Sequence, residues 1–130
     1  MTLATKIKVL LVDDELDITT TLKQGLEKHG FEVSVYNDPR KAIEEYQPNH
    51  YDLHVLDIRM PGMNGFDLAR RIWLQDPKAQ ICFLTAFEIY ETEANKVFKD
   101  LKSRCFLKKP ISTTVLARHL QKHLKSMQQD

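Results

Sequence analysis

Six polar residues stand at the ends of short apolar runs in this chain: Asp13, Asp14, Asp57, Thr85, Lys108 and Lys109. If those runs are strands of one parallel sheet, the side chains meet at one edge, because such sheets bind ligands outside the carboxyl ends of their strands. Two carboxylates about 4 Å apart repel by roughly 4 kcal/mol at an effective dielectric constant near 20. The patch therefore requires a cation.

The residue types indicate which cation and which reaction to expect. Carboxylate oxygens select hard divalent ions, and a few carboxylates with room for water favour Mg²⁺ over Ca²⁺. A lysine adds a fixed positive charge, and a threonine adds a hydroxyl donor. Together with a carboxylate nucleophile, these groups could accept and hold a phosphoryl group.

Alternating strands and helices are needed to bring these residues together. The β-prone apolar runs are residues 7–12, 31–36, 53–56, 81–84 and 105–107. Between them lie segments with helical spacing, such as Ile18, Leu22 and Leu26. Most of the runs lack a clean period of two, which predicts burial on both faces. We therefore predict an α/β fold with a parallel sheet covered by helices.

Capping residues and helix breakers mark the ends of the predicted helices. They are Gly30 after the first helix, Asp38 and Pro39 before the second, Asn64 before the third, and Asp76 and Pro77 after it. Residues 87–102 have mixed apolar spacing and predict the least regular helix. Residues 126–130 are expected to form a frayed tail.

Composition excludes several classes of protein. The 130 residues are 42% hydrophobic and 28% charged, which predicts one globular domain over residues 1–130 with a core from about 6 to 125. The net charge is +1 and no dense basic run occurs, so direct nucleic-acid binding is not expected. The apolar run at residues 7–12 is too short for a signal peptide or a membrane span, which predicts a cytoplasmic protein without a membrane partner.

The cysteines and histidines suggest no further site. Cys82 and Cys105 are too few for a disulfide framework and lack the CxxC spacing of a redox or zinc motif, so two reduced thiols and no zinc site are expected. His54 lies in a predicted strand and is expected to be semi-buried with its hydrogen bonds satisfied. His123, like the remaining histidines, is expected at the surface.

Four segments together resemble the signature of the response-regulator receiver domain of two-component signalling. They are LLVDDE (10–15), LDIRMPGMNG (56–65), FLTA (83–86) and FLKKP (106–110). The resemblance runs from residue 8 to about 125 and implies a flavodoxin-like (β/α)5 fold, a doubly wound five-stranded parallel sheet in the order 2-1-3-4-5. It also implies a stand-alone receiver that takes a phosphoryl group from a sensor histidine kinase or phosphotransfer protein and switches a surface for a downstream protein effector or for self-association.

The resemblance assigns roles to the acidic residues. Asp57 is the expected phosphoacceptor and also a ligand of Mg²⁺. Asp14 is expected to bind the ion directly and Asp13 largely through water, while the backbone carbonyl of Arg59 is the remaining expected protein ligand. A receiver of this kind catalyses its own phosphorylation and dephosphorylation, although it is mainly a signalling switch.

The last two segments supply the other expected roles. Lys109 is expected to contact the phosphoryl group, and its bond to Pro110 is expected to be cis. Thr85 and Phe106 match the hydroxyl and aromatic switch positions, although Phe106 lacks the hydroxyl that a tyrosine would use for a hydrogen bond.

Two other functions remain as alternatives. One is a pseudo-receiver or scaffold that binds partners without phosphorylation, although the signature residues for phosphorylation are all present. The other is a haloacid-dehalogenase-type phosphatase, which also uses an aspartate nucleophile and Mg²⁺. That family needs a second aspartate two residues after the nucleophile, where this chain has Arg59.

Overall fold

The structure is a computed structural model that describes residues 6–86 and 105–128, with side chains up to residue 124. Its elements are β1 (Ile7–Val12), α1 (Leu16–Lys28), β2 (Phe31–Tyr36), α2 (Pro39–Glu44), β3 (Leu53–Asp57), α3 (Gly65–Gln75), β4 (Ile81–Thr85), β5 (Cys105–Lys108) and α5 (Thr113–Gln128). The helix expected over residues 87–102 lies outside the described residues. None of the described helices is both long enough and apolar enough to cross a membrane.

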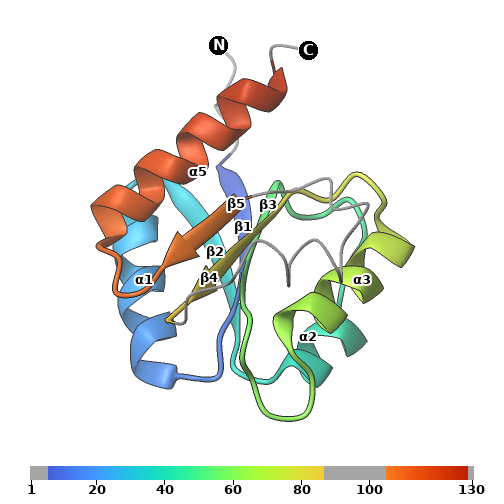
Figure 1. Cartoon of the computed structure of the whole chain (residues 1–130). Helices are drawn as coiled ribbons and strands as arrows, with labels where there is room; N and C mark the ends of the chain where they lie inside the picture. Colours follow the sequence, from blue (N-terminus) through green and yellow to red (C-terminus); the bar gives the residue numbers. More distant parts are fainter. Residues whose placement is uncertain (1–5, 87–104, 129–130) are drawn as a thin grey trace.

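The five strands form one parallel sheet in the order β2-β1-β3-β4-β5. Helices α1 and α5 cover one face of this sheet, and α2 and α3 cover the other (Figure 1). The predicted fold class and strand order are therefore confirmed. The order reverses at β1 and β3, where a doubly wound sheet leaves a crevice at the carboxyl ends of its strands.

Both faces of the sheet are packed, which explains why the strands lack a polar period. In β1, Val9 and Leu11 face the core under α1 and α5, whereas Leu10 and Val12 face the core under α2 and α3. All four side chains are at most 1% exposed. A strand buried on both sides has no solvent face, so its sequence is apolar throughout.

Strands β3, β4 and β5 each run one residue further than the apolar runs indicate. The ladder pairs Asp57 with Leu84 and Thr85 with Lys108, so three of the polar site residues, Asp57, Thr85 and Lys108, are themselves the last residues of strands. Hydrogen bonding along the ladder depends on the backbone, so it can continue after the side chains become polar.

Most predicted helix boundaries agree with the structure. The side chain of Asp38 accepts a hydrogen bond from the backbone N–H of Arg40, and that of Asn64 accepts one from Asp67. Gly30 has a φ of 91°, the left-handed conformation expected after a helix. The expected frayed tail was wrong in part, because α5 continues through Gln128.

The expectation of two reduced thiols was wrong, because Cys82 and Cys105 form a disulfide. The two residues are direct partners in the β4–β5 ladder, with their Cα atoms 4.6 Å apart, and both side chains face α5. The two cysteines are 23 residues apart in the sequence, so their pairing cannot be recognised from a local motif.

His54 has its hydrogen bonds satisfied as predicted, although it is fully rather than partly buried. Its Nε2 lies 2.8 Å from the Tyr46 hydroxyl, and its Nδ1 lies 2.9 Å from the Gln80 carbonyl oxygen. The same Tyr46 hydroxyl donates a hydrogen bond to Asp76. This network belongs to the α2–α3 side of the core and has no contact with the acidic residues at the strand ends among the interactions described.

Candidate functional site

The loop after β1 holds Asp13 in a fixed position. The Asp13 N–H donates to the Tyr36 carbonyl at 3.1 Å, which continues the β1–β2 ladder by one residue. The Asn37 side-chain amide donates to the Asp13 carbonyl and to the Thr19 hydroxyl, each at 2.9 Å. Asp13 Oδ1 in turn accepts from the Glu15 N–H at 2.9 Å. These bonds connect the loop to β2 and to the start of α1.

Asp57 is fixed by the end of β3 and by the start of α3. The Gly65 N–H donates to the Ile58 carbonyl at 2.7 Å, so the first turn of α3 lies directly against the chain that leaves β3. A Cβ atom at Gly65 would collide with the backbone carbonyl oxygen of Asp57. Only glycine permits this close approach, and the position of α3 therefore determines where Asp57 can lie.

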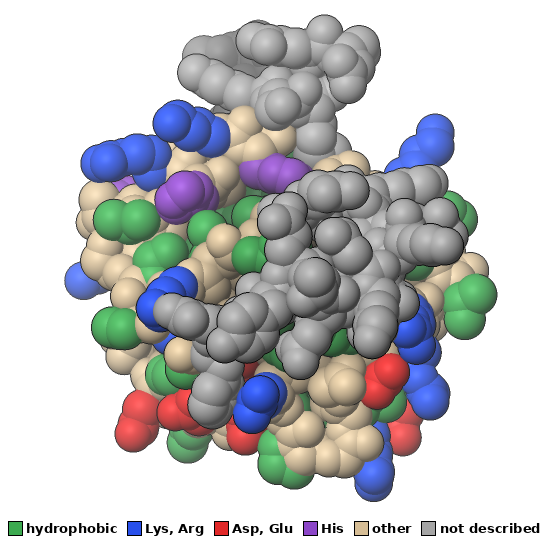
Figure 2. Space-filling model, in the orientation of Figure 1, with side chains coloured by type: hydrophobic (Ala, Val, Ile, Leu, Met, Phe, Trp, Pro, Cys, Tyr) green, Lys and Arg blue, Asp and Glu red, His purple; other side chains and the backbone are tan. Residues whose placement is uncertain are grey.

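The structure brings the three predicted carboxylates together. One side-chain oxygen from each of Asp13, Asp14 and Asp57 lies within 4.8 Å of the others. Asp13 is fully buried and Asp57 is 5% exposed, whereas Asp14 is exposed and opens the cluster to solvent. In Figure 2 the visible acidic side chains lie in the lower half of the face, the end at which α1 begins in Figure 1.

Lys109 extends into this acidic cluster from the loop after β5. Its Nζ lies 2.6 Å from Asp13 Oδ2, 3.4 Å from Glu15 Oε1 and 3.5 Å from Asp57 Oδ2. The Lys109 N–H donates to the Thr85 carbonyl at 2.8 Å, and the Lys109–Pro110 bond is cis as expected. One buried ammonium therefore faces three carboxylates, and it is closest to Asp13 rather than to Asp57.

The electrostatics of the site reflect this shortage of positive charge. Burial and the neighbouring Asp13 carboxylate raise the pKa of Asp57 to about 6, although Lys109 acts in the opposite direction. Burial alone would lower the pKa of Lys109, but Asp13, Asp57 and Glu15 together raise it above its usual value. Charge on Asp57 is thus disfavoured in the metal-free protein, and a further cation would relieve the repulsion.

The donor atoms of the cluster suit a hard divalent cation. Asp13, Asp14 and Asp57 offer only oxygen ligands, and the exposed side of the cluster leaves room for the water molecules that Mg²⁺ retains. Bound there, a divalent ion would balance the excess negative charge and polarise oxygen atoms of a ligand. The residues present therefore fit a magnesium ion.

The remaining predicted residues lie on β4, on β5 and just after β3. Thr85 is 5% exposed at the last position of β4, next to Lys108 in the ladder. Phe106 is half-buried on β5 and stacks on Phe83, with ring centroids 5.3 Å apart. Arg59 lies two residues beyond Asp57 with its side chain exposed, and its role as a carbonyl ligand stays a prediction.

Three residues of the site were not found from the sequence. Glu15 contributes a third carboxylate to the surroundings of Lys109, Asn37 fixes the Asp13 loop, and Gly65 sets the position of Asp57. Glu15 and Gly65 stand within the LLVDDE and LDIRMPGMNG segments, so those motifs could have indicated them. The role of Asn37 depends on how the loop after β2 approaches β1, which no local pattern reveals.

Comparisons with known proteins identify a matching family and a related protein. The family model described as "Response regulator receiver domain" matches residues 9–121. Sensor protein EvgS of Escherichia coli is 34% identical over 122 residues, which cover 92% of this chain and 10% of EvgS. The chain thus spans about a tenth of that relative.

Two solved structures show how far the similarity extends in three dimensions. The non-phosphorylated HemR receiver domain from Leptospira biflexa superposes with a TM-score of 0.81 at 34% identity, covering 92% of this chain and 94% of that one. The CheX-CheY-BeF3-Mg²⁺ complex from Borrelia burgdorferi matches with a TM-score of 0.77 at 25% identity, covering 89% and 87% of the two chains. The fold of this chain therefore recurs in proteins with those names.

Proposed function

Since the chain belongs to the family of response regulator receiver domains, we propose that Asp57 accepts a phosphoryl group in a Mg²⁺-dependent reaction. The observation that carries this proposal is the position of Lys109, whose ammonium lies within 3.5 Å of both Asp57 and Asp13 in a cluster of three carboxylates. A lysine between a nucleophilic carboxylate and a metal-binding carboxylate can stabilise the charge of a phosphoryl group as it arrives.

Asp57 has the protonation state that a nucleophile needs. With a pKa of about 6, the carboxylate is predominantly ionised at neutral pH. An oxygen of Asp57 forms the new bond to phosphorus while the bond from phosphorus to the donor breaks, and the leaving group departs with the bonding electrons. From phosphohistidine that leaving group is an imidazole, which takes up a proton.

The neighbouring side chains prepare the site for this transfer. A magnesium ion held by Asp13, Asp14, Asp57 and the Arg59 carbonyl would neutralise charge on the phosphoryl oxygens. Lys109 now pairs most closely with Asp13, at 2.6 Å against 3.5 Å for Asp57. When Asp13 instead interacts with the ion, the ammonium becomes available to the phosphoryl group on Asp57.

A groove beside the site can accommodate a phosphodonor protein. It runs between α1 and the loop after β5 and is lined by the apolar residues Ile18, Leu22, Leu84, Pro110 and Ile111, with Glu15 and Lys109 at the same opening. We place a sensor histidine kinase or phosphotransfer protein here, because a helix with an apolar face would cover the groove and bring its histidine near Asp57. We expect this exchange to take place in the cytoplasm.

The output begins at Thr85 and Phe106. A phosphoryl group adds roughly 1.5 to 2 negative charges and three acceptor oxygens at Asp57. The Thr85 hydroxyl moves toward these oxygens, and Phe106 then repacks against the space that Thr85 leaves. Phe106 lies on β5 and lines one pocket together with Val115 and His119 of α5. The change therefore alters a surface that binds a downstream protein or a second copy of the chain.

Phosphorylation with a small donor tests this function. The protein is incubated with acetyl phosphate, with and without Mg²⁺, and its intact mass is measured. We expect a gain of one phosphoryl group only when Mg²⁺ is present, and no gain for Asp57→Asn. Asp67→Asn is the matched control, because this half-exposed aspartate on α3 lies outside the cluster. Equal labelling of Asp57→Asn and wild type would overturn the proposal, and no labelling of wild type would favour a phosphorylation-independent scaffold.

A further inference from the structure

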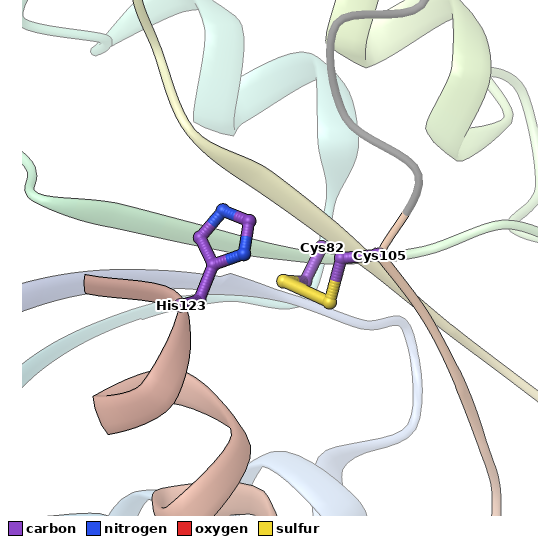
Figure 3. Close-up of side chains that lie close together, drawn as sticks. All are labelled: Cys82, Cys105 and His123. Atoms are coloured by element: carbon purple, nitrogen blue, oxygen red, sulfur yellow. A yellow bond between two sulfur atoms is a disulfide. The ribbon is translucent and has the colours of Figure 1, made fainter. Parts of the chain in front are cut away.

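A second group of ligand-type side chains lies near the opposite ends of the strands. Cys82 is the second residue of β4 and Cys105 is the first residue of β5, whereas the acidic cluster lies at the carboxyl ends. His123 belongs to α5, and Figure 3 shows its ring beside the disulfide. One ligand atom from each of the three residues lies within 4.8 Å of the others.

The hydrogen bonds of His123 orient its ring as in a metal site. His123 Nε2 lies 3.0 Å from Gln80 Oε1, and Gln80 Nε2 donates to the Lys78 carbonyl at 3.4 Å. The Gln80 oxygen can only accept, so the proton of the neutral ring is on Nε2 and the lone pair is on Nδ1. In Figure 3 the other ring nitrogen is on the side of the sulfur atoms. Metal-bound histidines are fixed in this way, by a hydrogen bond from the nitrogen that does not bind the metal.

The donor set selects the type of metal. Two thiolates and one neutral imidazole are soft or borderline ligands, which favour Zn²⁺ over Mg²⁺ or Ca²⁺. With Zn–S bonds near 2.3 Å, two sulfurs in a tetrahedral site lie about 3.8 Å apart. Two cysteines whose Cα atoms are 4.6 Å apart can reach that separation by side-chain rotation. Burial also lowers the pKa of His123, which favours the neutral form of the ring.

We propose that Cys82, Cys105 and His123 form a Zn²⁺ site that is open when the Cys82–Cys105 disulfide is reduced and closed when it is oxidised. A dithiol reductant supplies two electrons and two protons, which convert the disulfide into two thiols as the reductant itself becomes a disulfide. Binding of Zn²⁺ then releases both thiol protons. The fourth position is filled by water, which can approach because Cys105 and His123 are only partly buried.

Occupation of the site connects three elements of the fold. Either the disulfide or the metal joins β4 to β5, but only the metal also joins both strands to α5 through His123. Cys105 precedes the switch residue Phe106, and α5 packs on the same face of the sheet as both cysteines. The reduced, metal-bound protein therefore has α5 fixed to the sheet at the end remote from Asp57.

Metal titrations of reduced and oxidised protein test the site. Protein reduced by dithiothreitol and desalted under anaerobic conditions is titrated with Co²⁺, whose thiolate complexes give a sulfur-to-metal charge-transfer band, and then with Zn²⁺ to displace the Co²⁺. Excess Mg²⁺ is present throughout to occupy the acidic cluster. We expect one ion per chain in the reduced protein and no charge-transfer band in the oxidised protein.

Single substitutions distinguish a built site from nonspecific binding. Cys105→Ser and Cys82→Ser are each expected to weaken Zn²⁺ binding by at least about 100-fold, and His123→Ala by roughly 10- to 100-fold. His119→Ala is the matched control, because this exposed histidine of α5 lies outside the group. Circular dichroism confirms that each variant is folded. The proposal is refuted if reduced wild type shows no charge-transfer band, or if His119→Ala weakens binding as much as His123→Ala.

Discussion

Replacement of the proposed phosphoacceptor by asparagine is expected to stabilise the metal-free protein. The pKa of Asp57 in the folded protein is about 6, against roughly 3.9 for an unperturbed aspartate. A difference of about two pKa units means that ionisation of Asp57 destabilises the folded state by roughly 3 kcal/mol. Because solvent reaches the cluster at Asp14 and screens part of this repulsion, we expect Asp57→Asn to add about 1 to 2 kcal/mol to the free energy of unfolding at pH 7.5.

The pH dependence follows from the direction of the shift. The folded pKa is higher than the unfolded one, so the folded protein binds more protons between about pH 4 and pH 6 and loses stability as the pH rises through that window. Asparagine carries no charge in either state. The gain in the free energy of unfolding of Asp57→Asn over wild type should therefore be small near pH 4 and reach its full value above about pH 7.

Chemical denaturation in the presence of a chelator measures this difference. Wild type, Asp57→Asn and the control Asp67→Asn are unfolded by urea at pH 4.5, 6.0 and 7.5, and the control should stay within about 0.5 kcal/mol of wild type. Added Mg²⁺ should stabilise wild type more than Asp57→Asn, because the ion offsets a repulsion that the variant lacks. A variant that is less stable than wild type at pH 7.5, or whose advantage does not change with pH, would refute this reasoning.

Three further substitutions test how the site is built. Gly65→Ala should destabilise the protein by about 1 to 3 kcal/mol in urea denaturation and slow phosphorylation by acetyl phosphate, because the added Cβ displaces the backbone of Asp57; normal stability and rate would contradict this. Asp14→Asn should raise the Kd for Mg²⁺ by at least about tenfold in calorimetry, because an oxygen ligand of full charge is lost; unchanged binding would remove Asp14 from the ligand set. Thr85→Ala should leave Asp57 phosphorylatable while abolishing the phosphorylation-dependent NMR shifts of Phe106 and α5; shifts that persist would exclude Thr85 as the first step of the output.

The framework of the fold was predictable because its signals are local. The apolar runs at residues 7–12 and 31–36 coincide with β1 and β2, since turn residues bound both runs. Asp38 and Asn64 cap the helices they were expected to cap. The strand order was predicted from the resemblance to receiver domains, because apolar runs do not indicate which strands are neighbours in the sheet.

The remaining features depend on register and on close approach, which the sequence does not show locally. Cys82 and Cys105 are ladder partners only because β4 and β5 pair in one register. Lys109 was expected beside the phosphoacceptor Asp57, yet the closest partner of its ammonium is the fully buried carboxylate of Asp13. Which of the two carboxylates lies closer depends on the path of the loop after β1, which no local sequence pattern shows. His123 was expected to be a surface residue, but α5 places it against the sheet beside Gln80.

The most direct test of the central claim identifies the atom that carries the phosphoryl group. Wild-type protein is treated with acetyl phosphate and Mg²⁺ and then with borohydride, which reduces an acyl phosphate to a primary alcohol and converts the modified aspartate into homoserine. Peptide mass spectrometry then locates the converted residue. The account predicts homoserine at position 57 alone and only in samples that contained Mg²⁺, whereas conversion at position 13 or 14, or none at all, would contradict it.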